Sequence, residues 1–285
     1  MLAEDPASTY VSEPLNVLHR RGVFSAPVEK WYTYINSENE AHFLPAFRVM
    51  LAFNYGLGRE LRSLRSFRDA LRMLRDLGVF LDGRLNRRRP VIKDPFAAFS
   101  AAWFADKLGC DVVITVRHPA GFASSLKRLG WTFPMNDLLS QPRLVRDHLA
   151  PDREAMERLA PDDVLGQAAL LWRAIYRAVG KMAESNPRFI IVRQEDLALD
   201  PVPRFSNLYA ALDLTFSPKV ERAVLRSSSV GNPEEPSRRR VHSVRLDSAA
   251  STRTWRKRLD QAEIDRVRRL TEDVSSRFYS GAEWS

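Results

Sequence analysis

The residues best placed to do chemistry lie in one stretch, residues 111–130, which reads DVVITVRHPAGFASSLKRLG. A β-branched run ends in Arg117, and a His-Pro pair then leads into a short helical pattern. A helix that begins directly after a strand presents unpaired backbone N–H groups and the positive end of its dipole, so it favours an anion. Arg117 and Ser125 would add a guanidinium and a hydroxyl to such a site. The stretch therefore predicts an anion site, in particular one for a phosphate.

Composition indicates a globular chain with an excess of positive charge. The chain has 285 residues, 45% of them apolar, and 44 basic against 35 acidic residues leave a net charge of +9. This size and apolar content suffice for an ordinary core, and we expect a single domain over residues 1–285. The charge points to an anionic partner: a phosphorylated cofactor, an acidic sugar, nucleic acid or a membrane surface.

Cysteine usage and hydropathy bear on the compartment. Cys110 is the single cysteine, so the chain forms no internal disulfide and lacks the ligand set of a zinc site. No run approaches the roughly 20 apolar residues of a membrane helix, and no signal peptide opens the chain. We therefore expect a cytoplasmic protein with no transmembrane segment and no metal.

Four short apolar runs separated by helical patterns predict an α/β fold with a parallel β-sheet and helices on both faces. The expected strands cover residues 8–12, residues 90–93, the run that ends before Arg117, and residues 189–192. In such sheets ligands bind at the carboxyl ends of the strands. Polar residues follow each strand, and we expect them to face one crevice: Glu13, Lys93, Asp94, Arg117, Glu195 and Asp196.

Of the helical patterns that precede the anion motif, two have a distinctive composition. One is aromatic-rich and covers residues 28–35; the other covers residues 59–81, where leucines 61, 64, 71 and 74 form an apolar face. Arginines recur on a different face of the second pattern: Arg59, Arg62, Arg65, Arg68, Arg72 and Arg75. A solvated surface is the simpler interpretation of these arginines, and a groove for an acidic ligand is the alternative.

Two segments after the motif show little periodicity. Residues 131–161 carry four prolines and predict a lid or insertion over a site, or else a disordered flank. Residues 227–254 are polar and basic, include the cluster Arg238, Arg239 and Arg240, and read as irregular.

Taken in order, these segments resemble the sulfotransferases, which move a sulfuryl group from 3′-phosphoadenosine 5′-phosphosulfate (PAPS) to a hydroxyl or amine. RHPAGFASS resembles the family's 3′-phosphate motif, which implies that Arg117 and Ser125 bind that phosphate. VIKDPFAAFSAAWFA resembles the next strand and helix upstream, and the Glu-Asp-Leu at 195–197 resembles the segment after a later strand. STRTWRKRL and SEPLN resemble segments of carbohydrate-type members, and the first of them implies Arg253 as a second 3′-phosphate ligand.

The resemblance covers most of the chain and implies the fold as well. That fold is a P-loop nucleoside-triphosphate-hydrolase-like three-layer sandwich. The family's N-terminal phosphosulfate loop, a Gly-Thr-rich strand–loop–helix, does not occur in this sequence. The first residues, Met1 to Ala3, read as the end of that loop's helix, so we expect an N-terminally truncated domain that lacks its first strand and loop.

Sulfuryl transfer is an in-line displacement that needs a base for the acceptor proton and cations for the developing charge. The cytosolic branch of the family carries Lys-x-His after the second strand, and here Pro95 replaces that His. Carbohydrate-type members instead use a carboxylate, which implies Glu13 as the base, and Lys93 matches a family lysine that would neutralise charge. The alternatives are structural: Glu13 pairs with a nearby arginine, and Lys93 pairs with Asp94 or Glu195.

Two functions from different classes remain. The first is a PAPS-dependent sulfotransferase that acts on a carbohydrate or other small acceptor. The second is a non-catalytic nucleotide- or polyanion-binding protein that retains only the 3′-phosphate half of the site. A nucleic-acid interface ranks last because no aromatic residues interleave with the arginines. The sequence does not identify the acceptor or the oligomeric state.

Overall fold

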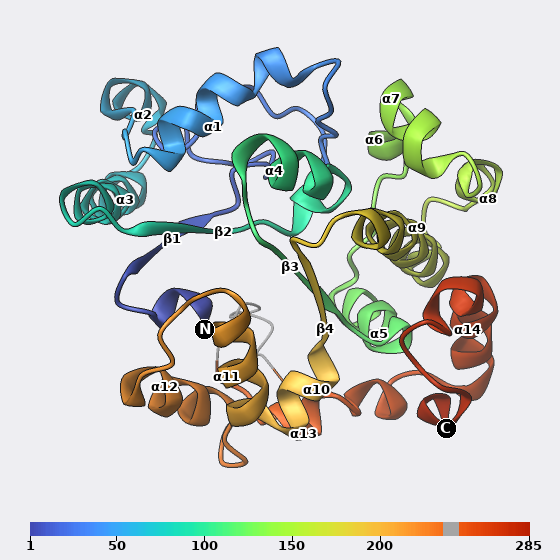
Figure 1. Ribbon diagram of the computed structural model, residues 1–285. Coiled ribbons are helices and arrows are strands. Elements are labelled where there is room, and N and C mark those ends of the chain that lie inside the picture. Colours follow the sequence, from blue (N-terminus) through green and yellow to red (C-terminus); the bar gives the residue numbers. More distant parts are fainter. Residues whose placement is uncertain (236–244) are drawn as a thin grey trace. The chain divides into compact units, whose positions relative to one another are not determined.

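The computed structural model describes residues 1–235 and 245–285 as a helix-rich mixed α/β protein with small parallel sheets (Figure 1). The predicted strands are all present: β1 (Ser8–Ser12), β2 (Arg89–Lys93), β3 (Val112–Val116) and β4 (Phe189–Arg193). The predicted cluster from Arg238 to Arg240 lies outside the described residues.

The strands pair two by two. β1 pairs in parallel with β2, with Ser8 opposite Arg89, and β3 pairs in parallel with β4, with Val112 opposite Phe189. Among residues 1–235 and 245–285, no ladder of backbone hydrogen bonds joins one pair to the other, so the single sheet expected from the sequence is replaced by two. The three-layer sandwich stays a prediction.

The chain divides into two compact units, Met1–Trp103 and Phe104–Ser285. Each unit contains one of the parallel strand pairs, β1 and β2 in the first and β3 and β4 in the second. The expectation of a single domain over residues 1–285 stays a prediction.

The first unit combines β1 and β2 with α1 (Leu44–Leu51), α2 (Leu57–Ser63) and α3 (Phe67–Leu85), together with 3₁₀ turns at Leu2–Glu4, Glu40–His42 and Pro95–Ser100. Asp94 caps the last of these turns. Its carboxylate accepts the N–H of Phe96 (2.9 Å) and that of Leu15 (2.6 Å), so it ties the end of β2 to the segment after β1. Burial raises the pKa of Asp94 to about 6.

The helix expected over residues 28–35 is absent, and this prediction was wrong. Tyr32 has φ 56°, a left-handed conformation that a right-handed helix does not accommodate. The N–H of Ile35 donates to Oγ of Ser100 (2.9 Å) instead of to a carbonyl one helical turn earlier. The ring of Tyr32 lies edge-on to that of Phe96, with centroids 5.4 Å apart. Aromatic packing therefore explains the composition of this stretch.

The helical pattern over residues 59–81 is realised as two helices, because Leu64 is extended and Ser66 starts α3 by accepting the N–H of Asp69. The apolar face formed by the leucines does not face the core, since Leu61, Leu71 and Leu74 are 51–58% exposed. The residues of α3 that are buried lie elsewhere on the helix: Met73, Phe80 and Gly83.

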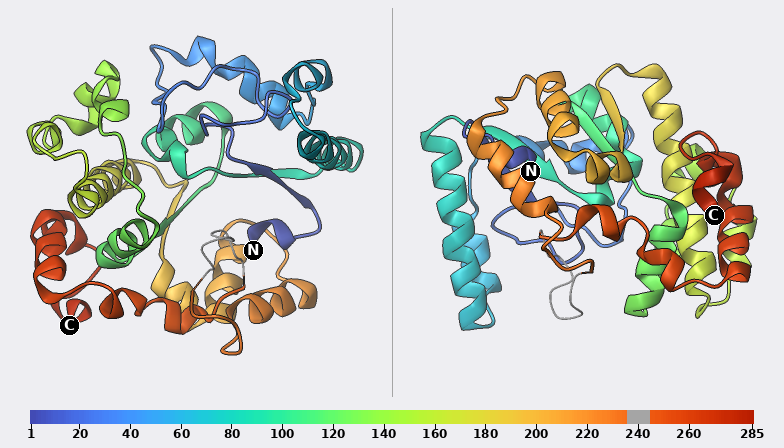
Figure 2. Two further views of the ribbon diagram at one scale, coloured as in Figure 1. Left: turned by 180° about the vertical axis from the view of Figure 1, so that it is seen from behind. Right: turned by 90° about the horizontal axis from the view of Figure 1, so that it is seen from below.

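Helix α4 (Ala101–Leu108) begins in the last residues of the first unit and continues into the second. The longer helices of the second unit and the short α13 follow it: α5 (Pro119–Leu129), α9 (Val164–Ser185), α10 (Gln194–Leu199), α11 (Pro201–Ala211), α12 (Pro218–Ser228), α13 (Ser248–Ser251) and α14 (Gln261–Ser275). Helices α5, α9 and α14 pack together around Ala120, Ala168 and Val267 (Figure 2). The carboxylate of Asp163 caps α9 by accepting the N–H of Gly166 (3.0 Å). None of the described helices is long and apolar enough to cross a membrane.

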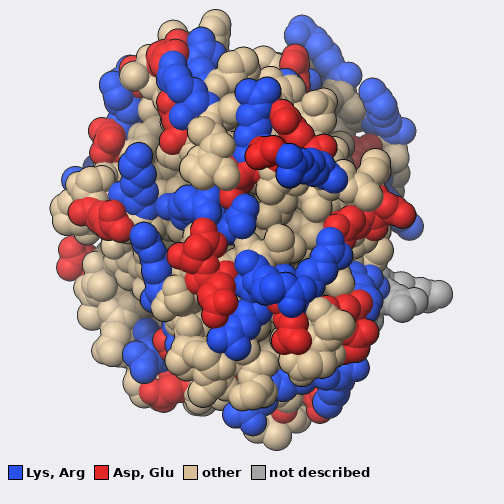
Figure 3. Space-filling model, turned by 90° about the vertical axis from the view of Figure 1, so that its right-hand side faces the viewer, with Lys and Arg blue, Asp and Glu red and all other residues tan. Residues whose placement is uncertain are grey.

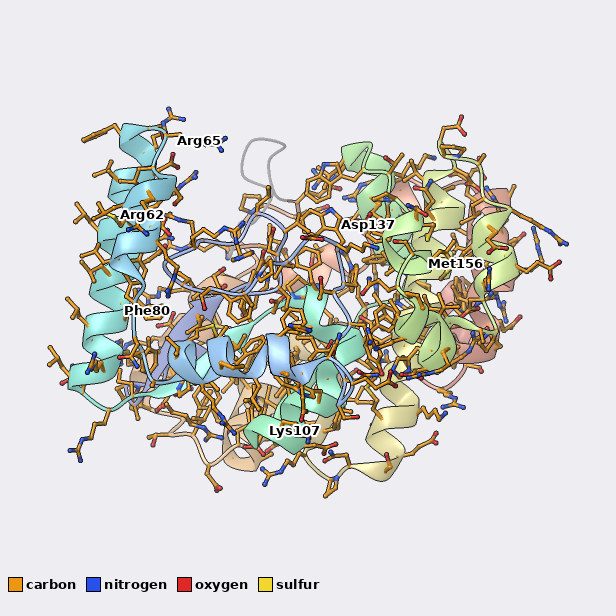
Figure 4. The ribbon with its side chains drawn as sticks, turned by 90° about the horizontal axis from the view of Figure 1, so that it is seen from above. Arg62, Arg65, Phe80, Lys107, Asp137 and Met156 are labelled. Carbon is orange, nitrogen blue, oxygen red and sulfur yellow. The ribbon has the colours of Figure 1, made fainter. Side chains whose placement is uncertain are left out.

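Residues 131–161, which read as irregular, contain short helices. These are α6 (Asn136–Leu139), α7 (Pro142–Leu144), a π-helical turn (Val145–Leu149) and α8 (Arg153–Glu157). Leu138, Leu144 and Met156 are buried, and Figure 4 marks the segment at Asp137 and Met156. The segment is thus packed in place, and its role as a lid or insertion stays a prediction.

Candidate anion site

Arg117 stands at the end of β3 with an unpaired guanidinium. Its side chain is half-buried, and within residues 1–235 and 245–285 the guanidinium makes no hydrogen bond or ion pair. Burial lowers the pKa of Arg117, and the negative charge of Glu195 offsets part of that shift. A desolvated cation without a partner is costly, so this arrangement favours an anionic ligand.

The first turn of α5 lies against this guanidinium. The His118 side chain at the N-cap makes no capping hydrogen bond, and the described chain supplies no acceptor for the amide N–H groups of Ala120 and Gly121. A Cβ on Gly121 would lie 3.2 Å from Nε of Arg117, closer than ordinary van der Waals contact. Glycine at this position therefore lets the guanidinium approach the free amides at the positive end of the helix dipole.

A second arginine reaches the same helix. Arg258 donates from Nη1 to Oγ of Ser124 (2.9 Å) and also pairs with Glu235. The positive charge of Arg258 also contributes to the lowered pKa of Arg117, after burial. Sequence reasoning missed Ser124 and Arg258. Each lies within a segment already singled out for phosphate binding, but the contact between them is not local in the sequence.

The other two residues implied as phosphate ligands lie on the same two elements. Ser125 is half-buried on α5, and in the described part of the chain its hydroxyl makes no hydrogen bond. Arg253 immediately precedes the 3₁₀ turn Thr254–Lys257, is exposed, and has no ion pair with any described residue. Their roles as 3′-phosphate ligands stay predictions.

His118 and Glu195 form the support behind the site. The His118 ring, only 4% exposed, stacks on Trp255 (centroids 5.0 Å apart, planes 3° apart) and meets the edges of Tyr279 (4.8 Å) and Trp284 (4.4 Å). Glu195 accepts the backbone N–H of His118 (2.9 Å) and the hydroxyl of Tyr279 (2.8 Å). These contacts fasten the strand end to the C-terminal segment and make His118 a packing group.

Stability should depend on pH through this ring, because burial lowers the pKa of His118 to about 3. Between pH 6.5 and 3 the unfolded chain protonates here and the folded chain does not, so stability falls as pH falls. Relative to His118→Phe, the wild type should lose about 2 kcal/mol between pH 7.5 and pH 5. Urea unfolding of both proteins at the two pH values measures this, and equal losses would contradict the assignment.

In the first unit, Glu13 and Lys93 lie together at the carboxyl ends of β1 and β2. Their side chains form an ion pair, and the N–H of Glu13 donates to the carbonyl of Lys93 (2.9 Å). Glu13 also accepts a hydrogen bond from Nδ2 of Asn16 (2.8 Å) and has φ 45°, so its backbone is held in a sharp turn. The structure thus brings together the two residues implied for catalysis, and their catalytic roles stay predictions.

A hollow of about 570 Å³ runs along β4 in the second unit. Its walls come from Ile190, Ile191, Leu197, Leu208 and Phe278, with Arg204 among the polar residues that line it. Arg117 is not part of this hollow, so it is separate from the anion site.

Charges are mixed on the face shown in Figure 3, where basic and acidic side chains lie side by side. Ion pairs between oppositely charged side chains include Arg193 with Glu283 and Arg266 with Asp163. The positive excess is therefore not gathered on this face. Among the residues described, no cluster of three or more His, Cys, Asp or Glu side chains is arranged to hold a metal ion.

No protein-family model matches the chain, and no curated protein matches it. Among solved structures, the chain is similar to a "Sulfotransferase Domain from the Curacin Biosynthetic Pathway", at 16% identity and a TM-score of 0.40, over 80% of this chain and 78% of that one. A likeness this distant transfers no function. Support for a function has to come from the residues of the site.

Proposed function

We propose that the protein is a sulfotransferase that takes a sulfuryl group from PAPS and transfers it to a hydroxyl or amine of a carbohydrate or other small acceptor. The observation that carries this proposal is the unpaired Arg117 guanidinium against the free amides of α5. The sequence resemblance gives this anion site a chemical identity, namely the place of the 3′-phosphate.

The residues present suit a 3′-phosphate. A dianionic phosphate would accept hydrogen bonds from the Arg117 fork, from the Ser125 hydroxyl and from the first-turn amides of α5. Arg258, which contacts Ser124 of α5, would offset the remaining charge, and the resemblance implies Arg253 as a further ligand. An anionic ligand would also stabilise the charged form of Arg117 against burial and against the charge of Arg258, which both lower its pKa.

In the proposed reaction the acceptor oxygen or nitrogen attacks sulfur, and the bond between sulfur and the bridging phosphate oxygen breaks. The acceptor proton goes to the Glu13 carboxylate, and the Lys93 ammonium neutralises charge on the transferring group. The products are 3′-phosphoadenosine 5′-phosphate (PAP) and the sulfated acceptor. These assignments follow from the resemblance, and the ion pair of the two side chains is compatible with them.

The alternative is a protein that binds nucleotide without transferring sulfate. The observation that favours it is the lack of a Gly-Thr-rich phosphosulfate loop among the 285 residues. A chain with only the 3′-phosphate half of the site would hold PAP and leave the sulfuryl group unassisted.

A ligand panel tests the proposal. Calorimetry should show PAP binding about 100-fold more tightly than adenosine 5′-monophosphate, because the latter lacks the 3′-phosphate and its charge-assisted hydrogen bonds. Equal affinities would contradict the site. Sulfate transfer from PAPS to a panel of sugars and amines, compared between the wild type and Glu13→Gln, then separates the two functions. Selective PAP binding without transfer would support the non-catalytic alternative.

A further inference from the structure

Helix α3 has two apolar faces, and one of them is exposed. Its buried face contains Met73, Phe80 and Gly83, and Figure 4 marks the helix at Phe80. Five large apolar residues, 49–78% exposed, share the opposite side of the helix: Phe67, Leu71, Leu74, Leu81 and Leu85. These five residues and Gly78 are called the α3 seam below.

The α3 seam has the spacing of a coiled coil. Its members follow one another at steps of four and three residues in alternation, which is the pattern of positions a and d in a heptad repeat. Monomeric proteins rarely expose a continuous apolar stripe of this extent. The 19 residues of α3 span about 28 Å, which is long enough for a helix-to-helix interface.

We propose that the α3 seam packs against the α3 seam of a second copy of this chain, with the two helices antiparallel. In the register that aligns the seams, Leu74 lies opposite Gly78 of the other copy. No atom lies within 4 Å of the place where a Cβ on Gly78 would stand, so nothing in the chain itself requires glycine there. The Leu74 side chain of the other copy would fill this space, whereas a parallel pairing would place Gly78 against Gly78 and leave a void.

Charges on the rim of the seam favour the same register. Antiparallel pairing places Arg68 beside Asp82 of the other copy, twice per dimer. Arg68 is exposed and has no ion pair among the described residues. The Asp82 side chain is 45% exposed and already forms an ion pair with Arg88 of its own chain, so Arg68 of the other copy would be its second partner. Arg75 would meet its own copy, but each Arg75 is neutralised by Asp76. Parallel pairing would instead set Arg75 beside Ala70 and Asp82 beside Leu77, with no opposite charge to meet.

An anionic membrane is the competing occupant, since arginines flank the apolar stripe. Two features favour a second copy. The Leu74 and Gly78 pair is complementary in shape, which a lipid surface does not require. Asp82 lies on the rim, where an anionic surface would repel it and Arg68 of a second copy attracts it.

The primary test is the mass of the full chain in solution by analytical ultracentrifugation over a range of concentrations. The wild type should form a dimer of its 32.6 kDa protomer. Leu74→Arg should raise the dimer dissociation constant at least about 100-fold, because it would bury an unpaired guanidinium in the seam. Leu199→Arg is the matched control, because Leu199 is 59% exposed and Leu74 is 58% exposed. It should dimerise as the wild type does, and circular dichroism should show that both variants are folded.

A monomeric wild type, or equal dimerisation of the wild type and Leu74→Arg, would overturn the proposal. So would a monomer whose binding to phosphatidylglycerol vesicles is lost in Leu74→Arg, since the seam would then be a membrane surface.

A charge exchange tests the register itself. Arg68→Asp and Asp82→Arg should each weaken self-association, about fivefold, because like charges then face each other across the rim. An equimolar mixture of the two variants should recover wild-type association, because each Asp then meets an Arg. Failure to recover in the mixture would exclude the antiparallel register.

Discussion

Arg117→Ala is expected to weaken PAP binding at least about 100-fold, equivalent to about 2.7 kcal/mol. The variant removes a bidentate donor whose charge is already desolvated and unpaired, so the phosphate would lose its strongest contact. The free amides of α5 would remain and would account for residual binding. Calorimetric titration of PAP into the wild type and the variant measures the difference.

Two further variants make this result specific. Arg117→Lys should bind PAP with intermediate affinity, because an ammonium keeps the charge and loses the planar fork. Arg204→Ala should bind as the wild type does, since Arg204 is an exposed arginine on α11 that takes no part in the site. Unchanged PAP affinity in Arg117→Ala would refute the site assignment.

The strands and the position of the anion motif were predictable because local signals decide them. β3 is a β-branched run that ends in Arg117, and a proline at the first position of α5 sets where the helix begins. Asp94 and Asp163 likewise mark helical starts by capping free N–H groups. In each case the interaction spans only a few residues, so the sequence reveals it directly.

The rest depends on which surface covers which. Periodicity identifies an apolar stripe on α3 but does not say which side the protein buries, and the stripe through Leu71 and Leu74 is the exposed one. The link between Ser124 and Arg258 joins residues 134 positions apart, so no local pattern could reveal it. The pairing of the four strands as two separate sheets is equally non-local.

The ion pairs of Asp152 are further contacts that the sequence did not reveal. Removing the Asp152 carboxylate should lower the stability of the fold strongly. The Asp152 side chain is fully buried and forms ion pairs with Arg173 (2.6 Å) and Arg177 of α9. Asp152→Ala would leave two largely buried guanidiniums short of their shared partner, so we expect the free energy of unfolding to fall by about 3–5 kcal/mol. Urea denaturation of the wild type and the variant at neutral pH measures this loss.

Glu154→Ala is the matched control, because the Glu154 and Arg158 pair lies on the same short helix with both side chains 76% exposed. That variant should change stability by less than about 1 kcal/mol, since solvent screens an exposed pair. A similar small loss in Asp152→Ala would show that the segment 131–161 is not anchored to α9 through this carboxylate. A large loss would mean that the ion pairs of Asp152 hold this part of the segment to α9. Any lid movement would then have to leave Asp152 in place and bend the chain at another point of the segment.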